Sequence, residues 1–365
     1  MEGPQAAGLY FTPKTKRLAR AFRSALAGRI SRALSGKFSQ PHFSRDLMPT
    51  PSIPTAPIRR PVDGAAVLTA VVLCFIWGLQ QVAIKAAGLE VSPMMQVSIR
   101  SGFAAALVLL WNRYVLKETW NTVVKPFHGF LTGLGFTGEF LFVAEGLRFT
   151  SASHMAVLLY TAPLFAAVIL AVKLPEERLS KVQWAGVACA FIGIVTAFGV
   201  PALMNSADSG LPEEWILGDV LGLLGGLSWG LTTVAIRTTT MNHAVSSQML
   251  FWQLAVAFAI LFPLGLLTGE SKFEPELIGW SSLIFQTLIV SFGSYLVWCG
   301  MLRKYLAARL GVLAFMTPLF GVAMGVVLLG ESIDVWFVIG AVLVLLGLVT
   351  VQGSGVLKSA VKRRS

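Results

Sequence analysis

From Gly64 onward, the sequence consists of apolar runs of about twenty residues separated by short polar breaks. An α-helix needs a run of this length to cross the hydrocarbon core of a bilayer, where it satisfies its own backbone hydrogen bonds. The sequence therefore predicts an all-α integral membrane protein with ten transmembrane helices. The runs lie near residues 64–86, 94–115, 127–147, 152–173, 181–200, 216–237, 245–268, 279–301, 306–329 and 333–352.

The composition agrees with a membrane location. Hydrophobic residues make up 55% of the 365 residues, charged residues only 13%, and the mean hydropathy is +0.72. A soluble protein usually carries about 25% charged residues. Cys74, Cys189 and Cys299 all fall within apolar runs, so we expect them to be small core residues and expect no metal site, disulfide or cofactor.

Residues 1–63 form a basic tail, with eleven Lys/Arg against three acidic residues and a proline-rich end at 49–61. Apolar residues recur at every fourth position among the arginines from Leu18 to Phe38. This pattern is compatible with a membrane-surface helix or an organellar transit peptide. A start of translation at Met48 is an equally good interpretation of residues 1–47.

A stretch inside the apolar runs occurs twice. Residues 75–87 and 227–239 share Trp, Gly, Leu, Val, Ala and Ile in register, and each copy contains a cation near its end. Residues 156–165 match 311–320 at an offset of 155. These matches predict two five-helix units, residues 64–200 and 216–352, joined by an extracytoplasmic linker at 201–215. Because five is odd, the second unit would be inverted in the membrane.

Basic residues predict the orientation. On one side of a ten-span arrangement lie Arg59, Arg60, Arg113, Lys117, Lys125, Lys173, Arg178, Lys181, Arg237, Arg303, Lys304, Arg309 and the cations of the C-terminal tail at 353–365. The opposite breaks carry only Lys85, Arg148 and Lys272. The positive-inside rule then places both termini in the cytoplasm, and we expect a bacterial inner membrane.

Several short motifs occur in order and in duplicate. They are the Trp77-Gly78 and Trp229-Gly230 spans, the turn at 144–152, the Pro163 and Pro318 spans, and the turns at Glu177-Arg178-Leu179 and Gly330-Glu331. Together they resemble the drug/metabolite transporter superfamily, EamA type, over residues 64–352. The resemblance implies two five-helix bundles around a central cavity, alternating access, and usually export of small metabolites or amino acids. Glu139, Glu145 and Pro175-Glu176-Glu177 depart from that pattern.

One face of the first span carries polar and aromatic groups, because steps of three and four residues return to the same side of a helix. We expect this face, and its copy in the sixth span, to line a substrate pathway. The residues are Trp77, Gln80 and Gln81, and in the copy Trp229, Thr232 and Thr233. Lys85 and Arg237 continue the two faces, but cations at span ends commonly reach toward the membrane surface.

Arg100 and Glu139 lie inside apolar runs, where a charge costs about 2.5–3.5 kcal/mol on insertion scales. Such charges face a partner or a watery cavity, so both are site candidates, and we expect Arg100 to be the counter-charge of Glu139. Further candidates for an amphipathic pocket are Tyr160, Gln248, Trp252, Gln253, Tyr295 and Trp298. For Glu145 we expect a local ion pair with Arg148, and for His154 an interfacial hydrogen bond.

Two further features concern the helix backbones. Pro163 and Pro318 occupy equivalent positions and predict helix breaks that expose the carbonyls of Leu159 and Ala314. In the sixth span, glycines spaced by four predict a ridge against which another helix packs closely. They are Gly218, Gly222, Gly226 and Gly230.

These features predict a secondary transporter, not an enzyme, that exports a small organic molecule or amino acid by alternating access. Motifs for nucleotide hydrolysis and for membrane metalloproteases do not occur in the sequence. The expected partners are a small-molecule substrate and the lipid bilayer, with no nucleic acid. Proton antiport through Glu139 is a hypothesis, and facilitated diffusion is its alternative. An intramembrane enzyme or lipid-handling protein is the alternative class.

Overall fold

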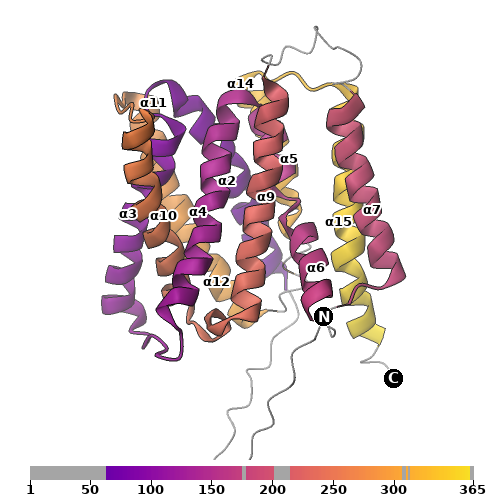
Figure 1. The fold of residues 1–365 in the computed structure, drawn as a ribbon, viewed down its shortest axis with the longest axis horizontal. Helices are drawn as coiled ribbons and strands as arrows, with labels where there is room; N and C mark the ends of the chain where they lie inside the picture. Colours follow the sequence, from indigo (N-terminus) through magenta and orange to yellow (C-terminus); the bar gives the residue numbers. More distant parts are fainter. Residues whose placement is uncertain (1–62, 175–177, 201–213, 306–309, 311–312, 362–365) are drawn as a thin grey trace, which may run out of the picture. The chain divides into compact units, whose positions relative to one another are not determined.

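A computed structural model describes residues 63–174, 178–200, 214–305, 310 and 313–361, all of which fall in one compact unit. The basic tail up to residue 62, most of the 201–215 linker and the chain end beyond 361 lie outside the described residues. The described chain is nearly all helical (Figure 1). An isolated β bridge pairs Val91 with Phe273.

The helices of the first half follow the predicted runs. They are α2 (Gly64–Ala86) with the short η1 (Ala87–Leu89), α3 (Pro93–Trp111) with η2 (Asn112–Leu116), α4 (Pro126–Phe149), α5 (Ala152–Leu159), α6 (Ala162–Lys173), and α7 (Lys181–Ile194) with η4 (Val195–Gly199).

The second half contains α9 (Trp215–Thr238), η5 (Thr240–His243), α10 (Ser246–Thr268), α11 (Leu277–Ile284), the π-helical η6 (Phe285–Ser294), α12 (Tyr295–Lys304), α14 (Met316–Leu329) and α15 (Val335–Val361). Seven stretches of the described chain are long and apolar enough to cross a membrane. Shorter apolar helices occupy Lys181–Ala197, Met316–Leu329 and Val335–Val351. The chain is thus a multi-pass membrane protein.

Local sequence explains several helix ends. The Asp63 carboxylate accepts the backbone N–H of Ala66 at 2.8 Å and caps α2. Ser180 and Gln183 form a capping box at the start of α7. Gly269 and Gly330 follow α10 and α14 with positive φ angles of 79° and 65°, a conformation in which glycine ends a helix without steric cost.

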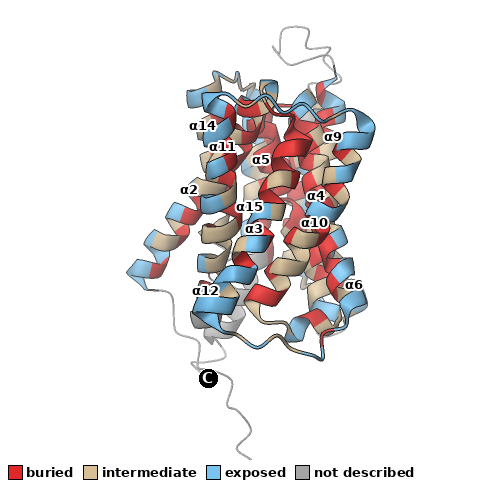
Figure 2. Cartoon of the chain, turned by 90° about the vertical axis from the view of Figure 1, so that its left-hand side faces the viewer, coloured by how far each residue is buried: buried red, intermediate tan, exposed pale blue. Residues whose placement is uncertain are grey.

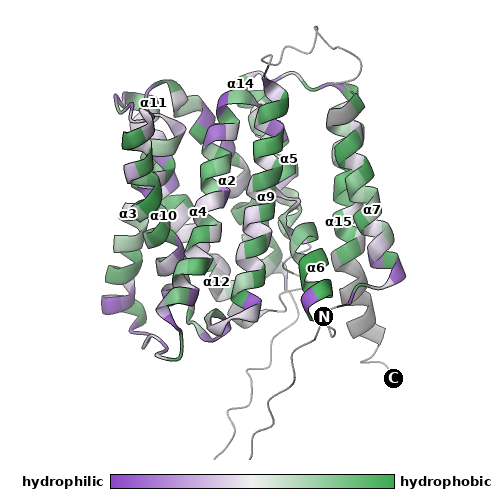
Figure 3. Cartoon of the chain, in the orientation of Figure 1, coloured by the Kyte–Doolittle hydropathy of each residue, from purple (hydrophilic) through white to green (hydrophobic). Residues whose placement is uncertain are grey.

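The outward faces of the helices are apolar, and the most buried helix is short. Exposed Leu68, Phe103 and Val327 exemplify the apolar surface that a bilayer would cover, and Figure 3 shows hydrophilic residues concentrated near the helix ends. All eight residues of α5 are buried (Figure 2). The largest buried hydrophobic cluster joins α3, α4 and α10 around Phe140 and Leu254.

Glycine contacts bring the two halves together. In α7, a Cβ placed at Gly186 would lie 2.9 Å from the carbonyl oxygen of Gly347 in α15, and one at Gly193 would lie 2.7 Å from that of Gly340. The two helices run side by side in Figure 1. Equivalent spans of the two halves therefore pair at backbone distance.

Candidate functional site

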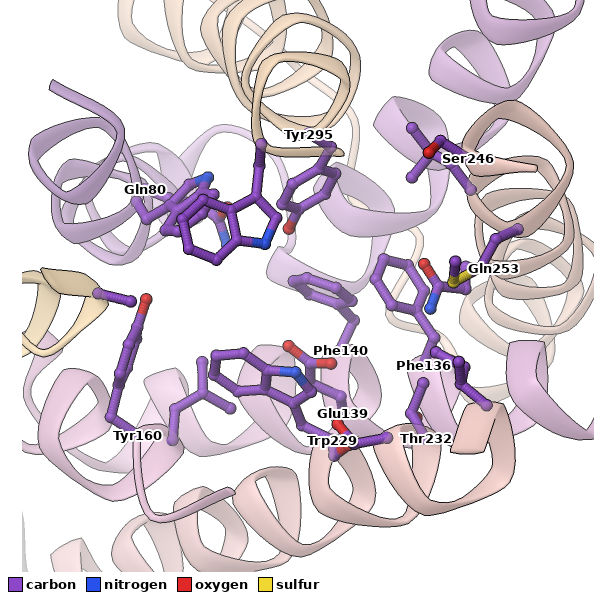
Figure 4. A pocket seen from close by; sticks show the side chains of 18 of the residues that line it. Gln80, Phe136, Glu139, Phe140, Tyr160, Trp229, Thr232, Ser246, Gln253 and Tyr295 are labelled. Atoms are coloured by element: carbon purple, nitrogen blue, oxygen red, sulfur yellow. The ribbon is translucent and has the colours of Figure 1, made fainter. Parts of the chain in front are cut away.

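A cavity of about 270 Å³ lies among helices of both halves. Its size is near the lower end of small-molecule pockets, which span roughly 300–1,000 Å³. The pocket contains charged, amide, hydroxyl and aromatic groups (Figure 4). Eleven of the fourteen residues predicted for the substrate pathway or pocket line this cavity: Trp77, Gln80, Gln81, Glu139, Tyr160, Trp229, Thr232, Thr233, Gln253, Tyr295 and Trp298.

The matched faces of α2 and α9 supply two walls. Trp77, Gln80 and Gln81 come from α2, and Gln80 and Gln81 are each only 4% exposed. In α9, the hydroxyls of Thr232 and Thr233 each donate to a carbonyl four residues earlier, so these side chains need no distant partner. Lys85 lies outside the lining, because its ammonium reaches the carbonyl of Thr150 at the end of α4.

Helix α4 contributes the only acidic side chain of the described cavity lining, Glu139. Glu139 is 6% exposed and lies between Phe136 and Phe140, which also line the cavity. In Figure 4, Glu139 lies beside Trp229 and Phe140, with Tyr295 and Gln80 on the other side of the cavity. The helix positions Glu139 at mid-length, as its place in the sequence predicted.

Arg100 does not line the cavity. Its guanidinium stacks on the Phe140 ring at 4.2 Å from the centroid, and its Nη1 donates to Oε1 of Gln286 at 3.3 Å. Nε2 of Gln286 in turn donates to Oε1 of Gln96 at 2.7 Å, and this bond extends a buried polar network between α3 and η6. Arg100 and Glu139 form no direct salt bridge, but the two buried groups attract each other at longer range.

A break between α5 and α6 supplies a further wall. The chain leaves helical geometry at Tyr160 and Thr161, and both Leu159 and Tyr160 line the cavity. Pro163 lies in the first turn of α6, where its missing N–H costs no helical hydrogen bond. Pro318 likewise lies in the first turn of α14, and Ala314 lines the cavity. The prolines thus follow helix ends and do not kink continuous helices.

Helix α10 completes the lining. Ser246, Met249, Leu250 and the predicted Gln253 line the cavity, with the i, i+3, i+4, i+7 spacing of one helix face. The predicted Trp252 lies beside this face and instead packs over Gly129, whose Cβ would come within 2.5 Å of its indole. Gln248 also lies outside the lining, and its amide donates to the carbonyl of Asn121. Phe136, Phe140 and Trp298 also line the cavity.

The glycine ridge of α9 lies against the chain that runs from the end of α4 into α6. A Cβ at Gly218 would lie 2.6 Å from the Thr150 nitrogen, one at Gly222 3.0 Å from Leu158, one at Gly226 2.6 Å from Thr161, and one at Gly230 2.9 Å from Phe165. Larger residues would collide with backbone as well as with side chains. The spacing therefore allows α9 to approach the broken span.

A buried polar cluster surrounds Asp219, which lies near the start of α9 and outside the cavity lining. Thr150 Oγ1 donates to Oδ1 of Asp219 at 2.5 Å, and Nδ1 of His154 lies 3.1 Å from Oδ2 of Asp219. The imidazole also stacks on Phe337, with ring centroids 4.3 Å apart. The carboxylate of Glu331 accepts backbone N–H groups of Ala152 and Ser153 at 2.7 and 3.0 Å. The cluster ties α5 to α9 and α14.

Sequence analysis predicted only part of the polar cluster around Asp219 and of its neighbouring ion pairs. The predicted ion pair between Glu145 and Arg148 is present at 2.8 Å, and Arg148 also contacts Glu270 at 2.6 Å. His154 was expected at the membrane interface, yet it is 4% exposed. Asp219 was not anticipated, although an acidic residue next to Gly218 in an apolar run was a usable signal. Within the described residues, no group of three or more His, Cys, Asp or Glu side chains could hold a metal ion.

Comparison with known proteins follows this geometry. The model of the EamA-like transporter family matches residues 64–199 and again 216–352. A "probable amino-acid metabolite efflux pump" of Salmonella typhimurium is 27% identical over 298 residues, covering 78% of this chain and 93% of that protein. The transporter YoaV of Bacillus subtilis is 24% identical over 281 residues, covering 75% and 91%.

A solved crystal structure also resembles the chain. It aligns with a TM-score of 0.56 and 18% identity, covering 78% of this chain and 95% of that one, which shows a shared fold. The two family matches coincide with the two halves whose helices enclose the cavity. This chain is a membrane transporter that belongs to the EamA-like transporter family.

Proposed function

We propose that the protein is a secondary transporter that exports a small organic molecule by alternating access, with the cavity as its substrate site. The observation that carries this proposal is the lining by equivalent faces of α2 and α9, one from each half. In inverted-repeat transporters, substrates bind near mid-membrane where the repeats meet. Amino acids or their derivatives are candidate substrates, since relatives are named as amino-acid metabolite efflux pumps.

The cavity favours access from one end. Its lining extends to Ile236, near the end of α9, and to Ser246, the first residue of α10. The backbone N–H of Lys125 donates to Oγ1 of Thr240 at 3.0 Å. This bond places the basic link between α3 and α4 beside the link between α9 and α10. We assign this basic end to the cytoplasm, with ten spans as two inverted five-helix repeats and both termini inside.

The opposite end would be the closed gate of this conformation. Thr150, His154 and Asp219 are each at most 4% exposed. Their hydrogen bonds connect the α4–α5 turn and α5 with α9, which belongs to the other half. Opening this end for release would require these bonds to break, and a molecule in the cavity could then leave on the side away from the cytoplasm.

The first experiment identifies and moves the substrate. Metabolites released by cells with and without the protein are compared, and the released compound is used as a tracer in vesicles containing purified protein. We expect saturable flux and recovery of the tracer unchanged. Chemical conversion of the tracer, or no protein-dependent flux of any released compound, would overturn the proposal and favour a membrane enzyme or lipid-handling protein.

A matched pair of variants ties this flux to the cavity. Thr233→Trp adds a large ring inside the cavity, and we expect it to reduce flux by about 10-fold or more through steric exclusion. Leu231→Trp adds the same ring on the 46%-exposed outer face of the same helix and should leave flux near that of the parent protein. Equal effects of the two variants would contradict a substrate route through the cavity.

The proposed coupling group is Glu139. A carboxylate facing a cavity in mid-membrane can exchange a proton with whichever side has access. Glu139→Gln keeps the shape but cannot exchange a proton, so a pH gradient should no longer drive uphill transport. Undiminished pH-driven transport by a well-folded Glu139→Gln protein would exclude this role and leave facilitated diffusion or another coupling residue.

A further inference from the structure

The cavity lining contains one acidic side chain and no basic one among the residues that the structure describes. Glu139 is the only Asp or Glu of the described lining, and no Lys, Arg or His belongs to it. Arg100 attracts Glu139 from behind the cavity wall, but a ligand does not reach its guanidinium, because Arg100 is 1% exposed and stacks on Phe140. A ligand in this cavity therefore meets Glu139 directly, with no basic side chain beside it in the described lining.

The carboxylate is also available to a ligand. Glu139 has no hydrogen-bond or salt-bridge partner within the described part of the chain, although it is 6% exposed. Oε1 of Gln81, which lies in the same lining, is a second buried acceptor with no hydrogen-bond partner among those residues. Buried acceptors without partners are costly, so this arrangement favours a ligand that brings N–H donors.

The surrounding rings suit the same kind of ligand. Tyr160 and Trp229 meet edge to face, with centroids 5.2 Å apart and planes at 88°. The ring centroid of Trp77 lies 6.2 Å from that of Tyr295 and 5.3 Å from that of Trp298. Rings set at such angles present electron-rich faces from several directions, and an ammonium group within about 6 Å of a ring face is attracted to it.

We propose that the cavity selects organic cations, meaning protonated amines on a small apolar or aromatic body that lack a carboxylate. This inference rests on the proposed function and narrows its candidates from amino acids and their derivatives to amines without a carboxylate. The ammonium lies between Glu139 and the Trp229 ring and donates to the carboxylate, while the apolar body fills the space toward Phe136 and Met249. An amino acid would bring its own carboxylate beside Glu139, where the described lining offers amide, hydroxyl and indole groups but no basic side chain to receive it.

The test uses three probes that share one carbon skeleton. They are phenethylamine, a cation; phenylalanine, which adds a carboxylate; and 3-phenylpropanoate, which has the carboxylate without the amine. Binding to purified full-length protein in detergent is followed by quenching of tryptophan fluorescence and by thermal stabilisation. We expect phenethylamine to bind about 10-fold or more tighter than phenylalanine, and 3-phenylpropanoate weakest of the three.

Variants connect the preference to the carboxylate. Glu139→Gln should remove most of the preference for phenethylamine over phenylalanine, whereas Glu139→Asp should keep it in part. Leu231→Trp, on the outer face of α9, should leave all three affinities unchanged. A monodisperse size-exclusion profile for each variant shows that it is folded, and the Asp variant provides the result if the Gln variant does not fold.

The outcomes separate this inference from the transporter proposal. Equal binding of phenylalanine and phenethylamine, tighter binding of 3-phenylpropanoate, or no binding of any probe would overturn the cation assignment. Saturable flux of a neutral or anionic compound in vesicles would then still support a transporter. Conversely, a Glu139-dependent preference for the amine in a protein that moves no compound would support the cation site and overturn the transport proposal.

Discussion

Two equivalent interfaces in the molecule are packed very differently. In the first, α4 meets α9: a Cβ at Gly138 would lie 3.0 Å from Oγ of Ser228, and Gly135 lies directly against Thr232. In the second, α2 meets the span that contains α11 and η6, residues 277–298. A groove of about 430 Å³ opens there between side chains such as Val72 and Leu288. Each interface joins the third span of one half to the first span of the other.

The difference shows that, within this one conformation, the two halves of the duplicated structure adopt different helix geometry and packing. Helix α4 is α-helical from Pro126 to Phe149, whereas its counterpart is interrupted by the π-helical η6. A hydrogen bond from Trp77 Nε1 to Ser294 Oγ at 2.8 Å still bridges the looser interface. If the halves exchange conformations, as inverted repeats allow, the tight interface loosens and the loose one closes. The predictions below test this exchange.

The largest effect is expected from locking the tight interface. A Cβ at Gly138 would lie 3.5 Å from that of Ser228, a distance suited to a disulfide. In a protein without the native cysteines, Gly138→Cys with Ser228→Cys should stop transport when oxidised, because α4 and α9 cannot separate. Tracer flux should return on reduction. Full flux through a quantitatively oxidised pair would refute opening at this interface.

Overpacking the same interface should cost stability. Gly135→Leu places a side chain where Thr232 already lies, and we expect a loss of about 1–3 kcal/mol in the free energy of unfolding. Ile289→Trp is the matched control, because it adds volume to the groove of the loose interface and should cost little. Unfolding in detergent measures both variants. A larger loss for Ile289→Trp would mean that the groove is already tightly packed.

Removing the bridge across the loose interface should have a smaller effect. Trp77→Phe deletes the indole N–H that donates to Ser294, and Ser294→Ala deletes the acceptor. Each should lower stability by about 0.5–1.5 kcal/mol, and the double variant should cost less than the sum. Strict additivity in this double-mutant cycle would show that the hydrogen bond does not couple the two helices.

The smallest effect is expected at the chain start. A protein that begins at Met48 retains every residue of the two matched segments, 64–199 and 216–352. It should therefore insert and transport like the full chain, as measured by membrane yield and tracer flux. Loss of insertion would instead assign a targeting role to residues 1–47.

Much of the fold follows from pattern, because a bilayer imposes length and polarity on each helix. The repeated Trp77 and Trp229 faces were predictable for the same reason, since helical spacing determines which side chains share a direction. Arg100 shows the limit of this reasoning. Its position predicted a costly charge needing a partner, but not that Phe140 and Gln286 in other helices provide it.

The helix breaks and the hydrogen bonds around Asp219 could not be predicted from the sequence alone, because they depend on contacts between residues far apart in the chain. Pro163 predicts an interruption, yet whether a proline kinks a helix or begins a new one depends on the neighbours that accept the freed carbonyls. The hydrogen bond of Asp219 with Thr150 joins residues 69 positions apart. The π-helical η6 contains no proline and has no evident sequence signature.

Sidedness of the cavity is the most direct test of the central claim that it opens toward the basic end. Single cysteines at Thr233, Leu89 and Val123 are placed in a background without Cys74, Cys189 and Cys299, and an impermeant thiol reagent is added to either face of oriented vesicles. Leu89 and Val123 are exposed at 84% and 58% and serve as markers of the two faces. Thr233→Cys should react from the same face as Val123→Cys, and that face should be cytoplasmic. Reaction of Thr233→Cys only from the Leu89 face would contradict the account.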